Sequence, residues 1–239
     1  MKTPDADEVD GRLMRAALDA APPPPSPEMV KALGTMTPVR TRSRFGAFLL
    51  VLVLGAIGPA YTLIHAPLRR DLGALPPAWV VIGAALWSLT FMLSLAAALV
   101  PARGDVLPSA ERASRASVIG MGALLLFSAL WTAHAPGISL RPEDLGQTMI
   151  QSGFACGRYV LQIAAIFLAL GFIVLRRVLP VGGRRIGLAI GAAGGAVAGL
   201  ALHFHCPIAS TGHVLISHAG VMVLGSLAGA LILHALLER

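Results

Sequence analysis

The chain has 239 residues, of which 56% are hydrophobic and only 13% carry charge. Soluble domains carry charge on about 25% of their residues, so this composition excludes an ordinary soluble domain. The formal net charge is +7 and the mean hydropathy is +0.75. A basic, apolar chain of this kind is typical of an integral membrane protein.

Residues 1–44 form a polar, proline-bearing cytoplasmic segment before the first apolar run. Apolar side chains at helical spacing over 9–20 predict a short amphipathic helix. Prolines at 22–25 predict a stiff spacer, and Ser26-Pro27 predicts the start of a second short helix. Such short helices are marginal alone in water, which favours a partner-binding segment over a folded domain. A disordered or membrane-surface segment is the alternative.

The expected contact residues of this segment lie on the apolar faces of its two short helices or beside them. They are Val9, Arg12, Leu13, Arg15, Ala16, Met29, Val30 and Leu33.

Six apolar runs follow, each close to the roughly 20 residues that a helix needs to cross a bilayer. They cover residues 45–64, 78–100, 117–133, 159–175, 186–202 and 214–237. Backbone groups in lipid must be satisfied internally, which favours helices, and the period-two alternation of barrel strands is absent. The sequence therefore predicts an all-α polytopic bundle of six transmembrane helices over residues 45–239.

The distribution of lysine and arginine predicts the orientation of the bundle. Of the 19 basic residues, 15 lie in the N-terminal segment, the loops after the second and fourth spans, or at the C-terminus. These regions are expected to be cytoplasmic, so both termini are inside. No cleaved signal peptide is expected, because a polar tail precedes the first apolar run. Basic residues that flank spans indicate contact with the lipid bilayer and no direct nucleic-acid binding.

Both cysteines and six of the seven histidines fall near the predicted outer ends of the spans. Thiolate and imidazole bind transition metals, although the spacing matches no familiar metal motif. A disulfide can also persist outside the cytoplasm. Redox sensing by Cys156 and Cys206, binding of a transition-metal ion, and plain helix packing all stay open. The candidate metal ligands are Cys156, His203, His205, Cys206, His213 and His218.

Glycines recur every four residues in the last two spans, at Gly191, Gly195 and Gly199 and again at Gly225 and Gly229. Small residues at this interval let helices approach closely in membranes. We expect them to pack the fifth span on the sixth.

Two rival classes are weaker on the sequence. A transporter of metal or small solutes needs ionisable residues at mid-membrane, where these spans hold mostly Leu, Ala, Val and Gly. An enzyme, such as a thiol oxidoreductase, lacks support because CxxC, HExxH and a carboxylate pair near the histidines are all missing. We predict no enzyme activity and keep a transporter or a thiol-redox membrane protein as alternatives.

The last third of the chain resembles one known family. His205-Cys206-Pro207, a final span with Gly225 and Gly229, and Cys156 at the start of the fourth span resemble the NrsF/CarR type of six-span membrane anti-sigma factor. The resemblance implies a multi-pass protein of the bacterial inner membrane that sequesters an extracytoplasmic-function sigma factor. It also implies release of that partner on an outer-face stress, such as oxidant, metal or light-generated reactive oxygen.

Overall fold

A computed structural model describes residues 26–28, 31, 44–100, 109–130, 142–176, 182–208 and 210–237. Within these ranges the chain is helical and has no strand. The predicted sigma-binding helix over 9–20, together with Met29, Val30 and Leu33, lies outside the described residues.

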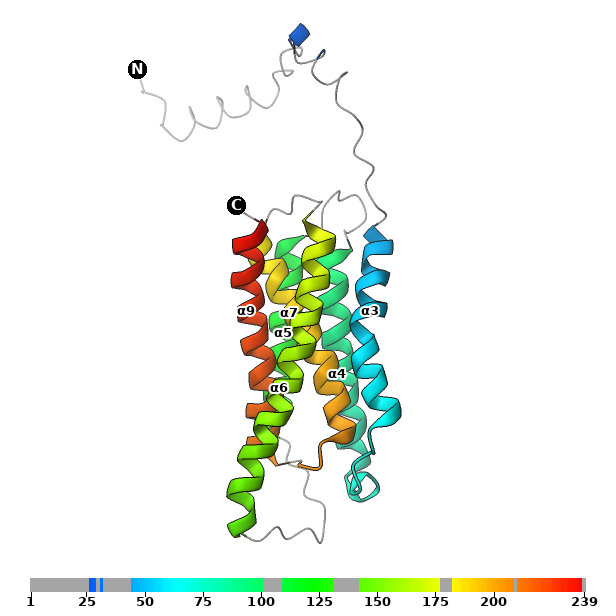
Figure 1. Cartoon of the computed structure of the whole chain (residues 1–239), viewed down its shortest axis with the longest axis vertical. Coiled ribbons are helices and arrows are strands. Elements are labelled where there is room, and N and C mark those ends of the chain that lie inside the picture. Colours follow the sequence, from blue (N-terminus) through cyan, green and yellow to red (C-terminus); the bar gives the residue numbers. More distant parts are fainter. Residues whose placement is uncertain are drawn as a thin grey trace, which may run out of the picture. The chain divides into compact units, whose positions relative to one another are not determined.

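Six long helical segments run along the bundle (Figure 1). Each is long and apolar enough to cross a membrane, as the sequence predicts for a multi-pass membrane protein. The last segment is continuous but changes its helical type, from α8 through the π-helix η2 to α9. The segments are α3 (Arg44–His65), α4 (Pro77–Leu99), α5 (Ala110–Leu130), α6 (Pro142–Leu175), α7 (Gly183–His205), and the series α8 (Thr211–His213), η2 (Val214–Gly220) and α9 (Val221–Leu237).

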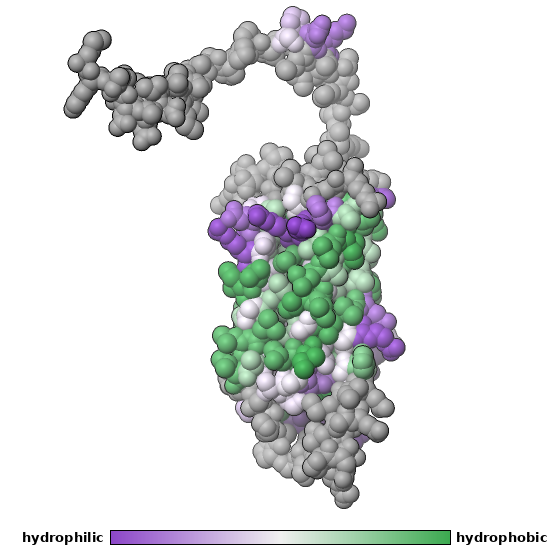
Figure 2. All heavy atoms as spheres, turned by 90° about the vertical axis from the view of Figure 1, so that its left-hand side faces the viewer, coloured by the Kyte–Doolittle hydropathy of each residue, from purple (hydrophilic) through white to green (hydrophobic). Residues whose placement is uncertain are grey.

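The outside of the bundle is apolar, which is the reverse of a soluble protein. Figure 2 shows apolar side chains over the middle of one face. Large hydrophobic residues such as Ile119, Leu130 and Ile216 are each about 70% exposed or more. Exposed apolar surface on this scale requires an apolar surrounding, because water would penalise it.

Local chemistry sets several helix ends. Pro77 occupies the first turn of α4, where its missing N–H costs nothing. The side chain of Ser109 accepts a hydrogen bond from the Arg112 N–H and so caps α5. Gly182 starts α7 at a φ of 93°, a conformation that other residues rarely adopt. Pro207 disfavours helical backbone at Cys206, where α7 ends.

Helix α7 lies at the centre of the bundle. In its span 89% of the most apolar window is buried, against 22–39% in the other spans. It contacts α3, α4, α5, α6 and α9. We call the end of the bundle where α3 begins the tail end, and the end where α7 finishes the cysteine end (Figure 1).

Small residues allow α7 to approach its neighbours closely. A Cβ on Gly191 would lie 2.7 Å from the carbonyl oxygen of Gly225 on α9, and one on Gly195 would meet Met222. Gly229 on α9 faces Gly187 on α7. Gly187 was not among the glycines singled out in the sequence for their four-residue spacing. Gly199 instead faces the ring of Trp87 on α4, so this position fits α7 to another neighbour.

The helix boundaries differ most from the sequence expectation in the third and fourth spans. Helix α5 begins at Ala110, 7 residues before the apolar run that starts at 117, and α6 begins at Pro142, 17 residues before the run that starts at 159. Polar residues can continue a helix beyond a membrane surface, so hydropathy alone marks the apolar core of a helix and not its ends.

Substituting Gly191 by Ala should destabilise the bundle by about 1–3 kcal/mol, because the added methyl meets the α9 backbone. The matched control is Gly122→Ala on α5, where a Cβ meets nothing within 4 Å. That variant should be neutral or stabilised by up to about 1 kcal/mol through helix propensity. Thermal unfolding of both variants in detergent measures the difference, and equal midpoints would contradict the packing described here.

Candidate functional site: a cysteine–histidine cluster

Four side chains meet at the cysteine end of the bundle. Cys156 lies in α6, Cys206 directly after α7, His213 in α8 and His218 in η2. Their ligand atoms all lie within 4.8 Å of one another. Cys206, His213 and His218 are buried, and Cys156 is partly exposed. The structure thus brings together four of the six residues that the sequence nominated.

The π-helix explains how His213 and His218 reach the same cluster. At about 100° per residue, positions five apart in an α-helix point roughly 140° away from each other. In a π-helix the hydrogen bond itself joins positions five apart, so those residues lie one above the other. Here η2 covers Val214–Gly220, and the two imidazole rings meet edge to face at 5.1 Å.

Sulfur lies at the centre of the cluster. The Cys156 thiol donates to Cys206 Sγ at 3.7 Å, and Cys206 Sγ is 3.2 Å from His213 Nε2. Both cysteines are free thiols. The hydrogen bond from Cys156 lowers the pKa of the Cys206 thiol and outweighs the opposing effect of burial; His213 and His218 lower it further. A thiol with a lowered pKa carries more of the thiolate that reacts with oxidants and metals.

The other two nominated histidines are used elsewhere. His203 Nε2 bonds the backbone oxygen of Val80 at 3.0 Å, and its ring stacks on Trp79 at 4.4 Å. His205 Nδ1 bonds the backbone oxygen of Pro67 at 3.0 Å. These contacts hold the end of α7 to α4 and to the loop after α3.

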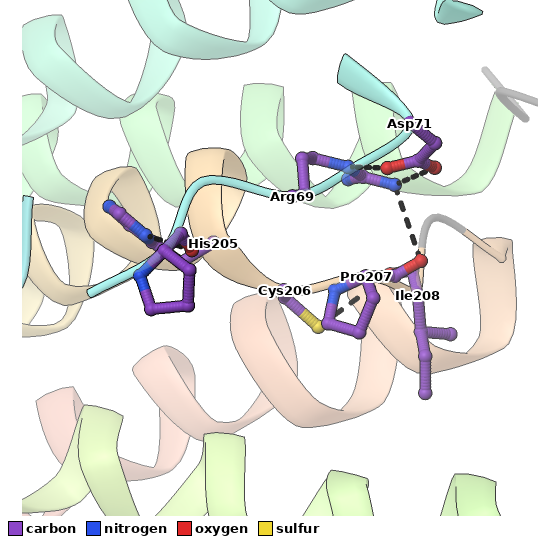
Figure 3. Close-up of polar contacts among 7 residues, drawn as sticks. Arg69, Asp71, His205, Cys206, Pro207 and Ile208 are labelled. Atoms are coloured by element: carbon purple, nitrogen blue, oxygen red, sulfur yellow. Dashed lines mark hydrogen bonds and ion pairs between the residues drawn. The ribbon is translucent and has the colours of Figure 1, made fainter.

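Arg69 joins that loop to the turn at Cys206, a role that the sequence gave no sign of (Figure 3). Its backbone N–H donates to Phe204 O at 3.0 Å, and its Nη2 donates to Pro207 O at 3.4 Å. The guanidinium also lies 5.7 Å from the centre of the Trp79 ring. Arg69 is only 5% exposed, whereas its neighbour Arg70 is exposed.

Asp71 holds the Arg69 guanidinium in place through two hydrogen bonds of 2.7 Å. The bond from Arg69 lowers the pKa of the Asp71 carboxyl. This ion pair therefore stabilises the fold above the ordinary carboxyl pKa of about 3.9, and its contribution is lost as the pH falls through the lowered value. We call Arg69, Asp71 and their contacts with Phe204 and Pro207 the Arg69 latch.

The cluster has a geometry that suits a tetrahedral metal ion. Two sulfurs at about 2.3 Å from a tetrahedral zinc are about 3.8 Å apart, close to the 3.7 Å between Cys156 Sγ and Cys206 Sγ. His218 Nε2 is buried without a hydrogen-bond partner among the described residues, so it has a free ligand atom. Two thiolates and two imidazoles form a donor set that zinc and similar ions accept.

Comparison with known proteins decides the family. The chain matches the family model described as negative regulator of sigma F, NrsF, over residues 34–238. The chain belongs to the NrsF family. This confirms the resemblance found in the sequence and places the protein in a family of negative regulators of a sigma factor, which is not an enzyme family. No curated protein and no solved structure matches the chain.

The cluster predicts a cobalt test of its geometry. Co²⁺ added to the reduced full-length protein should give the visible absorption of a tetrahedral site with thiolate ligands. Cys206→Ser should weaken binding by at least about tenfold, since even outer-shell changes cost that much. His205→Ala should retain it, because His205 lies outside the cluster. Equal binding by Cys206→Ser would contradict a metal site here.

Proposed function

We propose that this chain is a membrane-bound anti-sigma factor. Its N-terminal segment holds an extracytoplasmic-function sigma factor at the cytoplasmic face, and an oxidant or metal at the cysteine–histidine cluster releases it. The match to negative regulators of a sigma factor carries the proposal. The match begins at residue 34, so all eight proposed sigma-binding residues precede the matched range.

The charge pattern supports the cytoplasmic placement of the N-terminal segment. Of the 19 basic residues, 15 lie in the N-terminal segment, in the connections that follow α4 and α6 with the helix starts beyond them, or at the C-terminus. The preference of lysine and arginine for the inside predicts that these regions are cytoplasmic. The cysteine–histidine cluster then faces the periplasmic side of a bacterial inner membrane. Signal and partner are thus separated by the thickness of the bilayer.

Oxidation of the two thiols is one chemically complete signal. Two thiols and one hydrogen peroxide give one disulfide and two waters: the thiols lose two electrons and two protons, and the O–O bond breaks. The sulfur atoms must move from 3.7 Å to about 2.05 Å apart, which shifts the end of α7 relative to α6. A bound metal ion would also fix the distance between these helices.

The Arg69 latch supports a route from the cluster to the N-terminal segment. Cys206 and Pro207 are neighbours, and Pro207 O accepts a hydrogen bond from Arg69 in the loop after α3. Helix α3 runs from this loop to Arg44, where the N-terminal segment joins it. A shift of the turn at Cys206 changes the latch and so favours a different position of α3. The sigma factor is released if it binds the two positions with different affinity.

The proposed partner predicts direct binding to full-length protein. Protein in detergent should bind a sigma factor among a set of candidates that begins with any encoded beside its gene, and replacing Leu13 and Val30 with Asp should abolish binding. Charge reversal of Arg12 and Arg15 should weaken it. A matched control replaces Thr3 and Thr35 with Asp, which adds the same charge outside the proposed contacts. Absence of binding to any candidate sigma factor would overturn the anti-sigma role.

The proposed signal predicts that the cysteines are needed for release and not for repression. Replacing Cys156 and Cys206 with Ser should leave the sigma factor repressed and abolish its induction by oxidant or metal, measured with a reporter of sigma activity. Ala155→Ser adds the same hydroxyl beside Cys156 on an exposed position and should respond normally. Normal induction of the double cysteine variant would remove the thiols from the mechanism.

A further inference from the structure

A groove of about 790 Å³ opens beside the cluster, between α6 and the beginning of the last span. It faces outward, because Leu161 and Ile216 in its walls are 45% and 69% exposed. The apolar walls include Leu161, Ala165, Ile216 and Val221.

Glycines line the groove from α6 and from α8. A Cβ on Gly212 would meet nothing within 4 Å, so this position borders open space. A Cβ built on Gly157 would lie 3.3 Å from the side chain of Val221. A side chain of ordinary size at Gly212 would extend into the open space of the groove, whereas one at Gly157 would press on Val221.

One charged residue, Arg158 of α6, lines the groove. Arg158 lies five residues after Gly153, where the membrane-spanning part of α6 begins. No hydrogen bond or ion pair joins its guanidinium to another side chain that the structure describes. A guanidinium at this depth reaches toward the membrane surface, where phosphate groups are the available anions. Arginine binds phosphate through paired N–H donors.

The residues of α6 that line the groove follow one another as charged, polar and apolar, which is also the order of the groups along a phospholipid. Gln162 follows Arg158 by one turn, about 6 Å deeper, and Ala165 follows Gln162. A glycerophospholipid presents its phosphate, then ester carbonyls that accept hydrogen bonds, then an acyl chain. A free phosphate would leave the apolar part of the groove unfilled, and a purely apolar molecule would leave Arg158 unpaired.

We propose that this groove binds one glycerophospholipid of the leaflet at the cysteine end of the bundle. Arg158 binds the phosphate, Gln162 donates to an ester carbonyl, and an acyl chain lies between Leu161 and Ile216. His213 also lines the groove, and its Nε2 contacts Cys206 Sγ. The lipid therefore covers one side of the cysteine–histidine cluster and limits access to it from the membrane. This inference rests on the membrane-spanning bundle and not on the anti-sigma role.

A photoactivatable lipid tests the proposal. Full-length protein in nanodiscs receives phosphatidylglycerol that carries a diazirine on its acyl chain, and mass spectrometry locates the adducts after illumination. Adducts should concentrate on the walls of the groove. Arg158→Gln should lower them about tenfold, the effect of losing a charged hydrogen-bonded pair, while Arg158→Lys should retain much of the labelling. Gly212→Leu should block the groove, and Gly122→Leu, on an open position of α5, should not.

Three results would overturn the proposal. Groove adducts no denser than those around the lipid-facing Ile119 would mean ordinary lipid contact. Labelling unchanged in both Arg158→Gln and Gly212→Leu would exclude the proposed pose. Displacement of the lipid by millimolar inorganic phosphate would make a free anion the ligand. Thermal unfolding of every variant confirms that it is folded, and no sigma factor is present, so failure of the anti-sigma role cannot affect the outcome.

Discussion

The position of α7 at the centre of the bundle is the constraint on which the rest of the structure depends. Its run of glycine and alanine lets the backbones of its neighbours approach closely, as Gly191 and Gly225 do. Lipid gives no hydrophobic drive for helix association, so this close packing supplies the cohesion. Because α7 contacts the other spans and Cys206 follows it directly, a change at that cysteine acts on the helix that all the others share.

The turn after α7 holds a thiol of the cysteine–histidine cluster and also contacts Arg69 in the loop after α3. Pro207 ends the helix and leaves Cys206 facing Cys156 and His213, while the carbonyl oxygen of the same proline accepts from Arg69. A charged pair such as Arg69 and Asp71 is costly to bury and is retained only with good partners. Under the proposed function it links the thiols to the helix that leads to the sigma-binding segment, and α3, which is the least buried span, is the helix most easily moved.

Hydropathy predicted the six spans because apolar length is the dominant requirement of a bilayer. It did not predict where α6 begins, because helices continue into polar sequence. Cys156 and Cys206 could be paired from their common depth, and His218 was nominated with them. The sequence could not separate His218 from His203 and His205, because its meeting with His213 depends on a π-helix that the sequence pattern does not reveal. In the sequence, Arg69 contributed only to the count of basic residues that predicts orientation. Its burial depends on Pro207, 138 positions away, and such a contact needs the folded structure.

The most direct test of the coupling between cluster and tail compares Arg69→Gln with Arg70→Gln. Each full-length protein is loaded with the sigma factor and oxidised, and both disulfide formation and sigma release are measured. If Arg69 carries the signal, Arg69→Gln forms the disulfide and keeps its sigma factor, whereas Arg70→Gln, altered at an exposed neighbour, releases it as the wild type does. Normal release by Arg69→Gln would show that the signal crosses the bundle by another route.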